Sequence, residues 1–246
     1  MPKLGTSGSV GGPGGQLPGP IHSVPAPSAK VGTRMTEFDP ACQRCARLAQ
    51  FLAEGRGRNP SYHCAPVAPF GDPRPRLLIV GLAPGFHGAN ATGRPFTGDH
   101  AGILLYETLH HCGWSSAPAS VSRDDGLELR GCRITNAVKC VPPQNKPTPA
   151  EIATCNAFLA AEIESLDPGA VVLALGAIAH GAVLRARGLK ASAYVFGHGA
   201  EHLLPGGRRL FDSYHCSRYN TQTKRLTTEM FREVVGRATA RARGEG

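Results

Sequence analysis

The sequence predicts an α/β fold in which helices cover both faces of a mostly parallel sheet. Two short apolar runs, residues 76–82 and 170–175, have the length and composition of strands that are buried on both faces. Segments with helical signals separate the strand-like runs, and this alternation favours parallel pairing. Because ligands bind such sheets at the carboxyl ends of the strands, we expect the functional residues in the loops that follow the strands.

The other elements are assigned in order along the chain. Strands are also expected at residues 133–138 and 209–213, and helices at residues 101–112, 148–165, from 176 onward and 227–243. The helix start at Thr148 is the best defined, because a Thr cap, Pro149 in the first turn and Glu151 at the third helical position form a capping box. The last of these helices is basic and amphipathic.

The composition is typical of one folded domain preceded by a tail. The chain has 246 residues, of which 41% are hydrophobic, and residues 35–246 are expected to form a single domain. Residues 1–34 are rich in Gly and Pro and contain no acidic residue, which predicts a disordered tail. No apolar run approaches the ~20 residues of a membrane span and no signal-peptide pattern is visible, so we expect a cytoplasmic protein.

Four of the eight cysteines have the spacing of a metal site. Cys42 and Cys45 form a C-x-x-C pair whose two sulfurs can reach one centre. Cys140 is expected at the end of a strand, and Cys155 one turn into the next helix. Four thiolates in this arrangement can hold tetrahedral zinc or a [4Fe–4S] cluster, and the spacing does not choose between the two. Cys112 lies in apolar surroundings and is expected to be an ordinary buried thiol.

Two loop segments after the first predicted strand carry polar groups between glycines. Residues 81–88 read Gly-Leu-Ala-Pro-Gly-Phe-His-Gly, which matches neither a dinucleotide-binding motif nor a P-loop. Residues 92–99 place Arg94, Phe96 and Asp99 between glycines, which allow close approach of the backbone. A cation, an aromatic ring and a carboxylate in one such segment indicate a binding loop.

Three segments, residues 81–99, 134–147 and 215–221, carry the motifs of a known family in the same order. Together with the four cysteines, they make the chain from about residue 42 to residue 235 resemble the iron–sulfur uracil-DNA glycosylases, and among them the type-5 branch. The resemblance implies a three-layer α/β/α sandwich with a central four-stranded, mostly parallel sheet. It also implies a [4Fe–4S] cluster that is held by Cys42, Cys45, Cys140 and Cys155.

The chemistry implied by the resemblance is hydrolysis of the bond between a base and its sugar, on a nucleotide that is flipped out of the duplex. Cleavage leaves negative charge on the base and positive charge on the sugar. We expect His215 to donate a hydrogen bond beside the base carbonyl O2. We expect Asp99 to lie near C1′, where a carboxylate favours the sugar cation and orients water. Asn145 is expected to bind substrate or to position that water.

Further residues of these motifs are expected to bind the base. Phe96 would stack on it, and Asn136 can offer both a donor and an acceptor to its edge. The other predicted substrate contacts are Gly81, Ala83, Pro84, Gly85 and Arg218. The type-4 branch of the family carries an acidic residue in the loop that is apolar here. We therefore expect a wider pocket that accepts uracil and also deaminated purines such as hypoxanthine.

DNA is the expected partner, bound by a monomeric protein. Lys and Arg number 27 against 18 acidic residues, and the resulting net charge of +9 favours binding to a polyanion. Candidate phosphate contacts are Lys139, Lys146, Arg218, Lys224 and Arg225 in loops, and Arg232, Arg237, Arg241 and Arg243 on the last helix. Hydrolysis needs no metal, so the cluster is expected to act structurally, by tying the segment at Cys42 to the region from Cys140 to Cys155.

Two alternatives from other functional classes stay open at the level of sequence. An iron–sulfur electron carrier would explain the cysteines but leaves residues 94–99 and 215–218 without a purpose. A zinc-stabilised, non-catalytic DNA-binding module would explain the cysteines and the basic charge. Visible iron–sulfur absorption without base release would indicate the first, and a colourless protein with one tightly bound zinc ion would indicate the second.

Overall fold

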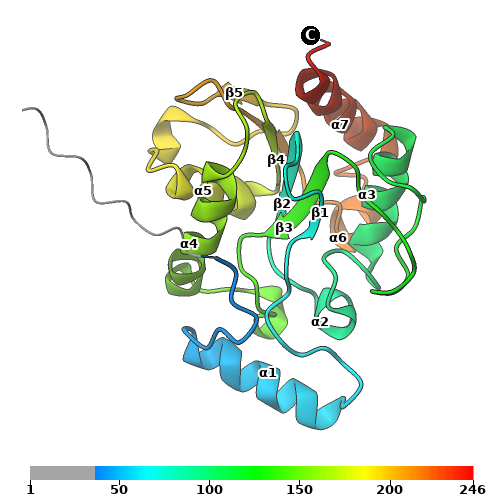
Figure 1. Ribbon diagram of the computed structural model, residues 1–246, viewed down its shortest axis with the longest axis vertical. Coiled ribbons are helices and arrows are strands. Elements are labelled where there is room, and N and C mark those ends of the chain that lie inside the picture. Colours follow the sequence, from blue (N-terminus) through cyan, green and yellow to red (C-terminus); the bar gives the residue numbers. More distant parts are fainter. Residues whose placement is uncertain (1–36, 246) are drawn as a thin grey trace, which may run out of the picture. The chain divides into compact units, whose positions relative to one another are not determined.

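A computed structural model describes residues 37–245, which contain a six-stranded sheet (Figure 1). The four central strands are parallel and follow the order β3 (Cys132–Asn136), β2 (Leu77–Gly81), β4 (Val171–Leu175) and β6 (Arg209–Ser213). Two short strands, β1 (Phe70–Gly71) and β5 (Glu201–Leu203), pair antiparallel with the edges at β3 and β6. The predicted tail, residues 1–34, lies outside the described residues.

The central sheet matches the prediction of four parallel strands, and the two edge strands increase the count to six. Strand β1 has two residues and β5 has three, so neither is long enough to show an alternating pattern in the sequence. Strand β3 ends at Asn136, two residues earlier than predicted. Cys140 therefore lies in the loop beyond the strand, which corrects its expected place at the strand end.

Helices cover both faces of the sheet and form the two outer layers of the predicted sandwich. Helices α3 (His100–His111) and α7 (Thr228–Arg243) pack on one face, and α4 (Pro149–Glu164) and α5 (Ala177–Ala186) pack on the other (Figure 1). Successive residues of β2 alternate between the two cores: Leu77 and Ile79 join the α3 and α7 side, whereas Leu78 and Val80 join the α4 and α5 side. Such two-sided burial explains why the strand reads as an unbroken apolar run.

Helix α4 begins as the sequence predicts. The Thr148 hydroxyl accepts a hydrogen bond from the Glu151 backbone N–H at 3.2 Å, and the Glu151 carboxylate accepts one from the Thr148 N–H at 2.7 Å. Both halves of the capping box are therefore present. The same carboxylate accepts two hydrogen bonds of 2.7 Å from Arg47, so the start of α4 is also linked to the N-terminal region.

Helix α1 (Ala46–Arg58) was not predicted from the sequence. It begins directly after Cys45 without a side-chain cap and buries only Leu48, Leu52 and Gly55. With so narrow an apolar face and no capping signal, its sequence reads as a polar connecting segment. The shorter helical segments are α2 (Ala89–Thr92), η1 (Pro143–Asn145), η2 (Ala191–Ala193) and α6 (Arg218–Gln222).

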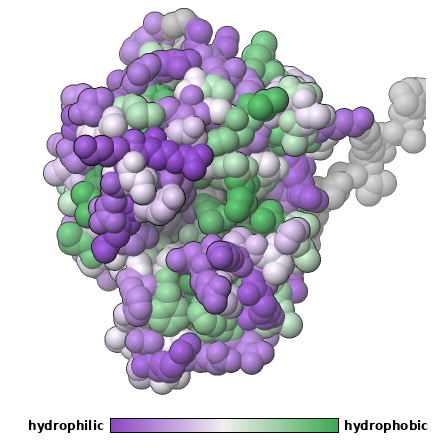
Figure 2. Space-filling model, turned by 180° about the vertical axis from the view of Figure 1, so that it is seen from behind, coloured by the Kyte–Doolittle hydropathy of each residue, from purple (hydrophilic) through white to green (hydrophobic). Residues whose placement is uncertain are grey.

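Most of the surface on the face opposite to that of Figure 1 is hydrophilic. Figure 2 shows that apolar side chains gather near the middle of this face and that hydrophilic side chains surround them. None of the helices in residues 37–245 combines the length with the apolar character that crossing a bilayer requires.

Candidate active site

Gly81 closes strand β2 at the point where two predicted base-binding residues approach the backbone. A Cβ atom at Gly81 would lie 2.7 Å from the Phe96 ring and closer still to Asn136 Oδ1, far inside van der Waals contact. Only glycine therefore fits, and its absent side chain leaves room for the Phe96 ring and the Asn136 amide. Phe96 itself is buried and has a positive φ of 56°, so the loop holds it in a strained conformation.

Asn136 lies at the carboxyl end of β3, where the register places it opposite Gly81. Its side chain is buried, and its Oδ1 atom has no hydrogen-bond partner among the described residues. An unpaired buried amide oxygen is costly, which marks the position as one where a ligand is expected to complete the hydrogen bonding. The predicted role of Asn136 in reading a base edge fits this geometry.

Asp99 caps the N-terminus of α3 and faces the loop that follows β2. One carboxylate oxygen accepts a hydrogen bond of 3.0 Å from the Gly102 N–H. A Cβ atom at Gly88 would lie 2.7 Å from the other oxygen, so a glycine is required there as well. Burial raises the pKa of Asp99, and the hydrogen bond from Gly102 opposes that shift. The structure thus holds a partly desolvated carboxylate in a fixed position.

His215 follows β6 and packs against Phe96. The two rings are stacked with centroids 5.8 Å apart and an angle of 25° between their planes. Burial lowers the pKa of His215 to about 4, so the imidazole is neutral at pH 7. A neutral ring carries one N–H, and no described residue forms a hydrogen bond with either ring nitrogen of His215. The side chain can therefore donate to a ligand.

Asn220 is a residue of the site that was missed from the sequence. Its side-chain amide donates a hydrogen bond of 2.8 Å to the backbone carbonyl of His215. It lies within the third motif, residues 215–221, so the motif itself was the signal that could have singled it out. Gly176, which follows β4 with a φ of 96°, passes behind the His215 Cβ atom.

A cleft of about 1100 Å³ opens beside this group. Of the predicted site residues, Gly85, Asp99, Asn145 and Arg218 line it. Asn145 and Arg218 are exposed. Asn145 lies in the segment after β3 and Arg218 in the segment after β6, and the fold brings both to the cleft. The exposed position of Asn145 fits contact with a bound strand or with water.

Ala83 and Pro84 lie in the loop that follows β2, between Gly81 and Gly85. Pro84 is buried, and neither residue lines the cleft. Ala83 packs against the hydrophobic cluster that contains Leu48 and Cys140. The side chain of Ala83 thus points toward the cysteine region, and any contact it makes with a base must come from its backbone.

One wall of the cleft, residues 118–121, is tied to the loop of Asp99 by a buried ion pair. Arg94 binds Asp125 at 2.6 Å and stacks on the Phe70 ring at 4.3 Å from its centroid. Burial alone would raise the pKa of Asp125, but hydrogen bonds from Arg94 and from backbone N–H groups hold it well below its usual range. Thr97 and Ser120 form a further contact of 2.7 Å. Arg94 is therefore a supporting residue of the cleft wall.

Several predicted phosphate contacts are engaged within the protein. Lys139 is 1% exposed and its ammonium group binds Glu162 at 2.5 Å, so its predicted contact with DNA is wrong. On α7, Arg232 pairs with Glu107, Arg237 and Arg241 face Glu201, and Arg243 donates to the Cys112 carbonyl. The loop residues Lys146, Arg218, Lys224 and Arg225 are exposed and remain the better candidates.

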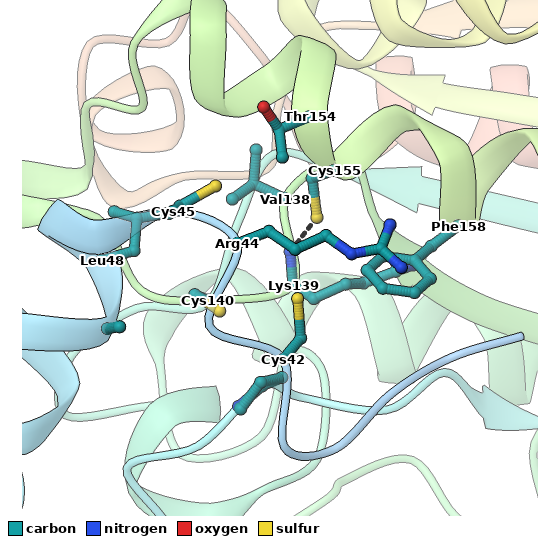
Figure 3. A pocket seen from close by; sticks show the side chains of 12 residues that line it. Cys42, Arg44, Cys45, Leu48, Val138, Lys139, Cys140, Thr154, Cys155 and Phe158 are labelled. Carbon is teal, nitrogen blue, oxygen red and sulfur yellow. Dashed lines mark hydrogen bonds between the residues drawn. The ribbon is translucent and has the colours of Figure 1, made fainter. Parts of the chain in front are cut away.

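The four predicted ligand cysteines line a single cavity. Cys42 and Cys45 approach it from the segment before α1, Cys140 from the loop after β3, and Cys155 from α4 (Figure 3). Burial and the neighbouring thiols raise the pKa of Cys140 to about 12. Cys155 lies in the second turn of α4, one turn into the helix as predicted, and its sulfur accepts a hydrogen bond of 3.2 Å from the Lys139 N–H.

The donor set and its spacing fit an iron–sulfur cluster better than a single ion. Four thiolates around zinc would be about 3.8 Å apart, as tetrahedral Zn–S bonds of about 2.3 Å require. Among the described residues, the group whose ligand atoms lie within 4.8 Å of one another is His180, His202 and Asp212, and the cysteines do not meet that limit. A cluster has several metal atoms, so its ligands stand further apart. Cys112, in contrast, is only half-buried and lies outside this cavity.

In the compact group of His180, His202 and Asp212, hydrogen bonds account for the short distances between the side chains. His180 binds Asp212 at 2.8 Å through Nδ1 and the Tyr194 carbonyl at 2.9 Å through Nε2. His202 binds the second carboxylate oxygen of Asp212 at 3.1 Å. Both ring nitrogens of His180 face acceptors, so both must donate and the ring is cationic. The group is thus a buried ion pair between α5, β5 and β6.

The fold and this arrangement define a class of protein: the chain belongs to the uracil DNA glycosylase superfamily, whose family model matches residues 68–238. Among curated proteins, the chain is 51% identical over 200 residues to the type-5 uracil-DNA glycosylase of Thermus thermophilus, which covers 79% of this chain and 91% of the relative. It is 46% identical over 205 residues to the type-5 enzyme of Pyrobaculum aerophilum, with 82% and 89% covered.

A type-4 uracil-DNA glycosylase of Thermotoga maritima is also similar, with 43% identity over 105 residues, which is 42% of this chain and 46% of the relative. The type-5 relatives thus match most of the chain, whereas this type-4 relative matches less than half of it. The predicted resemblance to the type-5 branch is confirmed.

Proposed function

We propose that this protein hydrolyses the N-glycosidic bond of uracil in DNA and leaves an abasic site for base excision repair. The observation that carries the proposal is a chain of contacts at the carboxyl end of the sheet. Asn136 and Phe96 meet at Gly81, His215 stacks on Phe96, and Asp99 lies against Gly88 in the loop that follows the same strand. A buried carboxylate, an unpaired amide oxygen and a neutral imidazole are the groups that base extrusion and cleavage require.

In the proposed mechanism, His215 acts on the leaving base. Because its ring is neutral and unpaired, it can donate its N–H to the base carbonyl O2, where negative charge develops. A donor that is already in place needs no reorganisation when the bond breaks. Asn136 binds the base edge, and its buried Oδ1 accepts a hydrogen bond from it.

Asp99 acts on the sugar side. Its carboxylate is held by the Gly102 N–H and stands at the wall of the cleft, where C1′ of a flipped nucleotide would arrive. The negative charge favours the cationic sugar of the transition state, and the carboxylate orients the attacking water. Asn145 and Arg218, at the entrance of the same cleft, contact the water or the strand.

We further propose that Cys42, Cys45, Cys140 and Cys155 hold a [4Fe–4S] cluster. The support is the cavity that all four thiols line, together with the finding that no three of these sulfurs form a group within 4.8 Å of one another among the described residues. When bound, the cluster supplies structural bracing and no hydrolytic chemistry. It joins the segment before α1 to the loop after β3, which is the strand that carries Asn136.

The substrate range is proposed to include hypoxanthine. The segment after β2 is apolar and places no acidic side chain beside the base, so it imposes fewer polar demands on the ligand. We also propose that the protein acts as a monomer in the cytoplasm. No described contact favours the electron-carrier alternative, and the spacing of the thiols argues against the zinc-module alternative.

The test is release of free base from duplexes that contain a single uracil or a single hypoxanthine. Anaerobically purified protein is incubated with each duplex, free base is measured by mass spectrometry, and abasic sites are revealed by scission in alkali. We expect release of both bases and none from an undamaged duplex. Absence of uracil release overturns the proposed function, and release of uracil alone overturns the wider substrate range.

A further inference from the structure

We propose that His198 is a positioning residue for His215: it holds the turn after β6 by accepting a hydrogen bond from the backbone N–H of Tyr214. The inference rests on the proposed role of His215 as the donor to the leaving base. His198 itself lies in the segment before β5, and it is not part of any motif found in the sequence.

The contact between His198 and the turn is made by a ring nitrogen and a backbone amide. The Tyr214 N–H donates to His198 Nδ1 at 3.2 Å, and the Ser213 hydroxyl lies 3.4 Å from the same nitrogen. The His198 ring also stacks on the Tyr214 ring, with centroids 5.0 Å apart and 19° between the planes. One histidine thus satisfies the backbone and fixes the side chain of the residue directly before His215.

The protonation state of His198 suits this role. An Nδ1 that accepts a hydrogen bond must be unprotonated, so the single proton of the neutral ring is on Nε2. Burial lowers the pKa of His198, which favours the neutral form, while Glu233 and the backbone carbonyl of Met230 oppose that shift. The Met230 carbonyl belongs to the first turn of α7, so α7 also lies near the His198 ring.

Other residues also hold the turn after β6, but none of them can replace the hydrogen bond between the Tyr214 N–H and His198. Asn220 binds the carbonyl of His215, and Arg225 covers the outer face of the Tyr214 ring at 4.6 Å from its centroid. Neither group reaches the Tyr214 N–H, which His198 alone satisfies among the described residues. Without an acceptor there, we expect the partly buried amide to turn toward water and to carry the neighbouring His215 with it.

A misplaced donor lowers the rate of the chemical step more than it lowers the binding of substrate. His215 can donate to the base only when its ring lies stacked on Phe96, and the position of its backbone determines that stacking. A small displacement therefore weakens a hydrogen bond that is strongest in the transition state. We expect loss of the His198 acceptor to lower kcat about tenfold while KM for a uracil-containing duplex changes by less than about threefold.

Two matched substitutions separate the ring of His198 from its acceptor. His198→Phe keeps an aromatic ring on Tyr214 but removes the nitrogen, whereas His198→Asn loses the ring but places an amide oxygen close to the position of Nδ1. We expect H198F to show the tenfold loss of kcat and H198N to retain kcat within about threefold. Equal activity of H198F and wild type, or an H198N variant that is as impaired as H198F, overturns the proposal.

His202→Asn is the control for stability alone. His202 lies on the same edge of the sheet and binds Asp212, but it does not contact the turn that holds His215. We expect this variant to lower the melting temperature without lowering kcat. If H198F does not fold, kcat of H198N is compared with kcat of wild type. Retained kcat supports the positioning role, because the acceptor alone then holds the turn, and a tenfold loss contradicts it.

A second readout does not depend on turnover. The imidazole resonances of His215 in a histidine-labelled protein report the position of its ring relative to Phe96. We expect these resonances to shift in H198F and to stay at the wild-type position in H202N. Unshifted His215 resonances in folded H198F overturn the positioning role of His198. This result does not depend on uracil release by the wild type, so failure of the positioning role is distinct from failure of the proposed function.

Discussion

The base-binding end of the sheet and the cysteine cavity are built in different ways. The first is assembled from loops that follow β2, β3 and β6, and glycines such as Gly81 and Gly88 let its side chains meet. His215 already has the neutral ring that its role requires, and the Asp99 carboxylate is already held by the Gly102 N–H. In the second, burial and the other thiols raise the pKa of Cys140 to about 12, which opposes the thiolate that a metal needs.

The comparison separates a site that the fold forms by itself from a site that the proposed cluster would complete. Parallel strands bring the catalytic loops to a common edge whether or not substrate is present. At the cysteine cavity, the proposed cluster would add bonds between the Cys42 segment, the loop after β3 and α4, beside the Arg47–Glu151 ion pair that already links α1 to α4. Substitutions at the first site should therefore affect rate, and substitutions at the second should affect stability.

The largest effect is expected at His215. Replacement of His215 by Ala removes the donor to the leaving base, and loss of one such donor costs about 10²–10³-fold in kcat. Single-turnover release of uracil measures the loss, and a melting curve checks that the fold is kept. A His215→Ala protein that releases uracil at half the wild-type rate or faster would show that the departing base is stabilised by another group.

The next largest effect is expected at Cys140. Cys140→Ser should abolish the absorption near ~400 nm that a cluster gives and lower the free energy of unfolding by about 3 kcal/mol or more. The matched control is Cys112→Ser, because Cys112 is half-buried and lies outside the cavity. Equal stability of the two variants, or unaltered activity in a cluster-free C140S protein, contradicts the structural role.

Two glycine substitutions sharpen the account of the catalytic end. Gly81→Ala pushes a methyl group into Phe96 and Asn136, and we expect kcat/KM to fall about 10²-fold because both side chains must move. Gly57→Ala, in a helix where nothing lies within 4 Å, is the control and should leave kcat/KM unchanged. If the two variants have the same activity, the close approach at Gly81 does not matter for base binding.

The smallest effect concerns pH. Burial lowers the pKa of His215 from 6.5 to about 4, so the unfolded chain binds more protons than the folded protein between these values. The contribution of His215 to stability is therefore fully present above about pH 6.5 and is lost as the pH falls toward about 4, by at most about 1.4 kcal/mol per pH unit. Urea unfolding at pH 7 and pH 5 should show a weaker pH dependence in His215→Gln than in wild type; identical dependence refutes the assignment.

The sequence was sufficient for the elements with strong local signals. The central strands have continuous apolar runs, and the capping box at Thr148 fixes the start of α4. The motif residues Phe96 and Asp99 come near His215 because the segment after β2 and the turn after β6 lie at the same edge of the sheet. For such residues, the strand order of a parallel sheet predicts from the sequence that their side chains lie at the same edge.

Contacts between distant segments could not be read in the same way. Lys139 looks like a loop cation in the sequence, but Glu162 on α4 buries and neutralises it. The support that Arg94 gains from Asp125, and the approach of His198 to Tyr214, likewise depend on how loops pack. No local periodicity or spacing encodes these pairings, since they arise only when the layers are assembled.

The most direct test of the central claim is single-turnover release of uracil from a duplex by wild-type protein and by Asp99→Asn. The substitution keeps the shape of the side chain and its hydrogen bond from Gly102 but removes the charge that faces the sugar. We predict rapid release of free uracil by the wild type and a loss of about 10²-fold in the variant. Release at the same rate by both proteins would contradict the assignment of this end of the sheet as the catalytic centre.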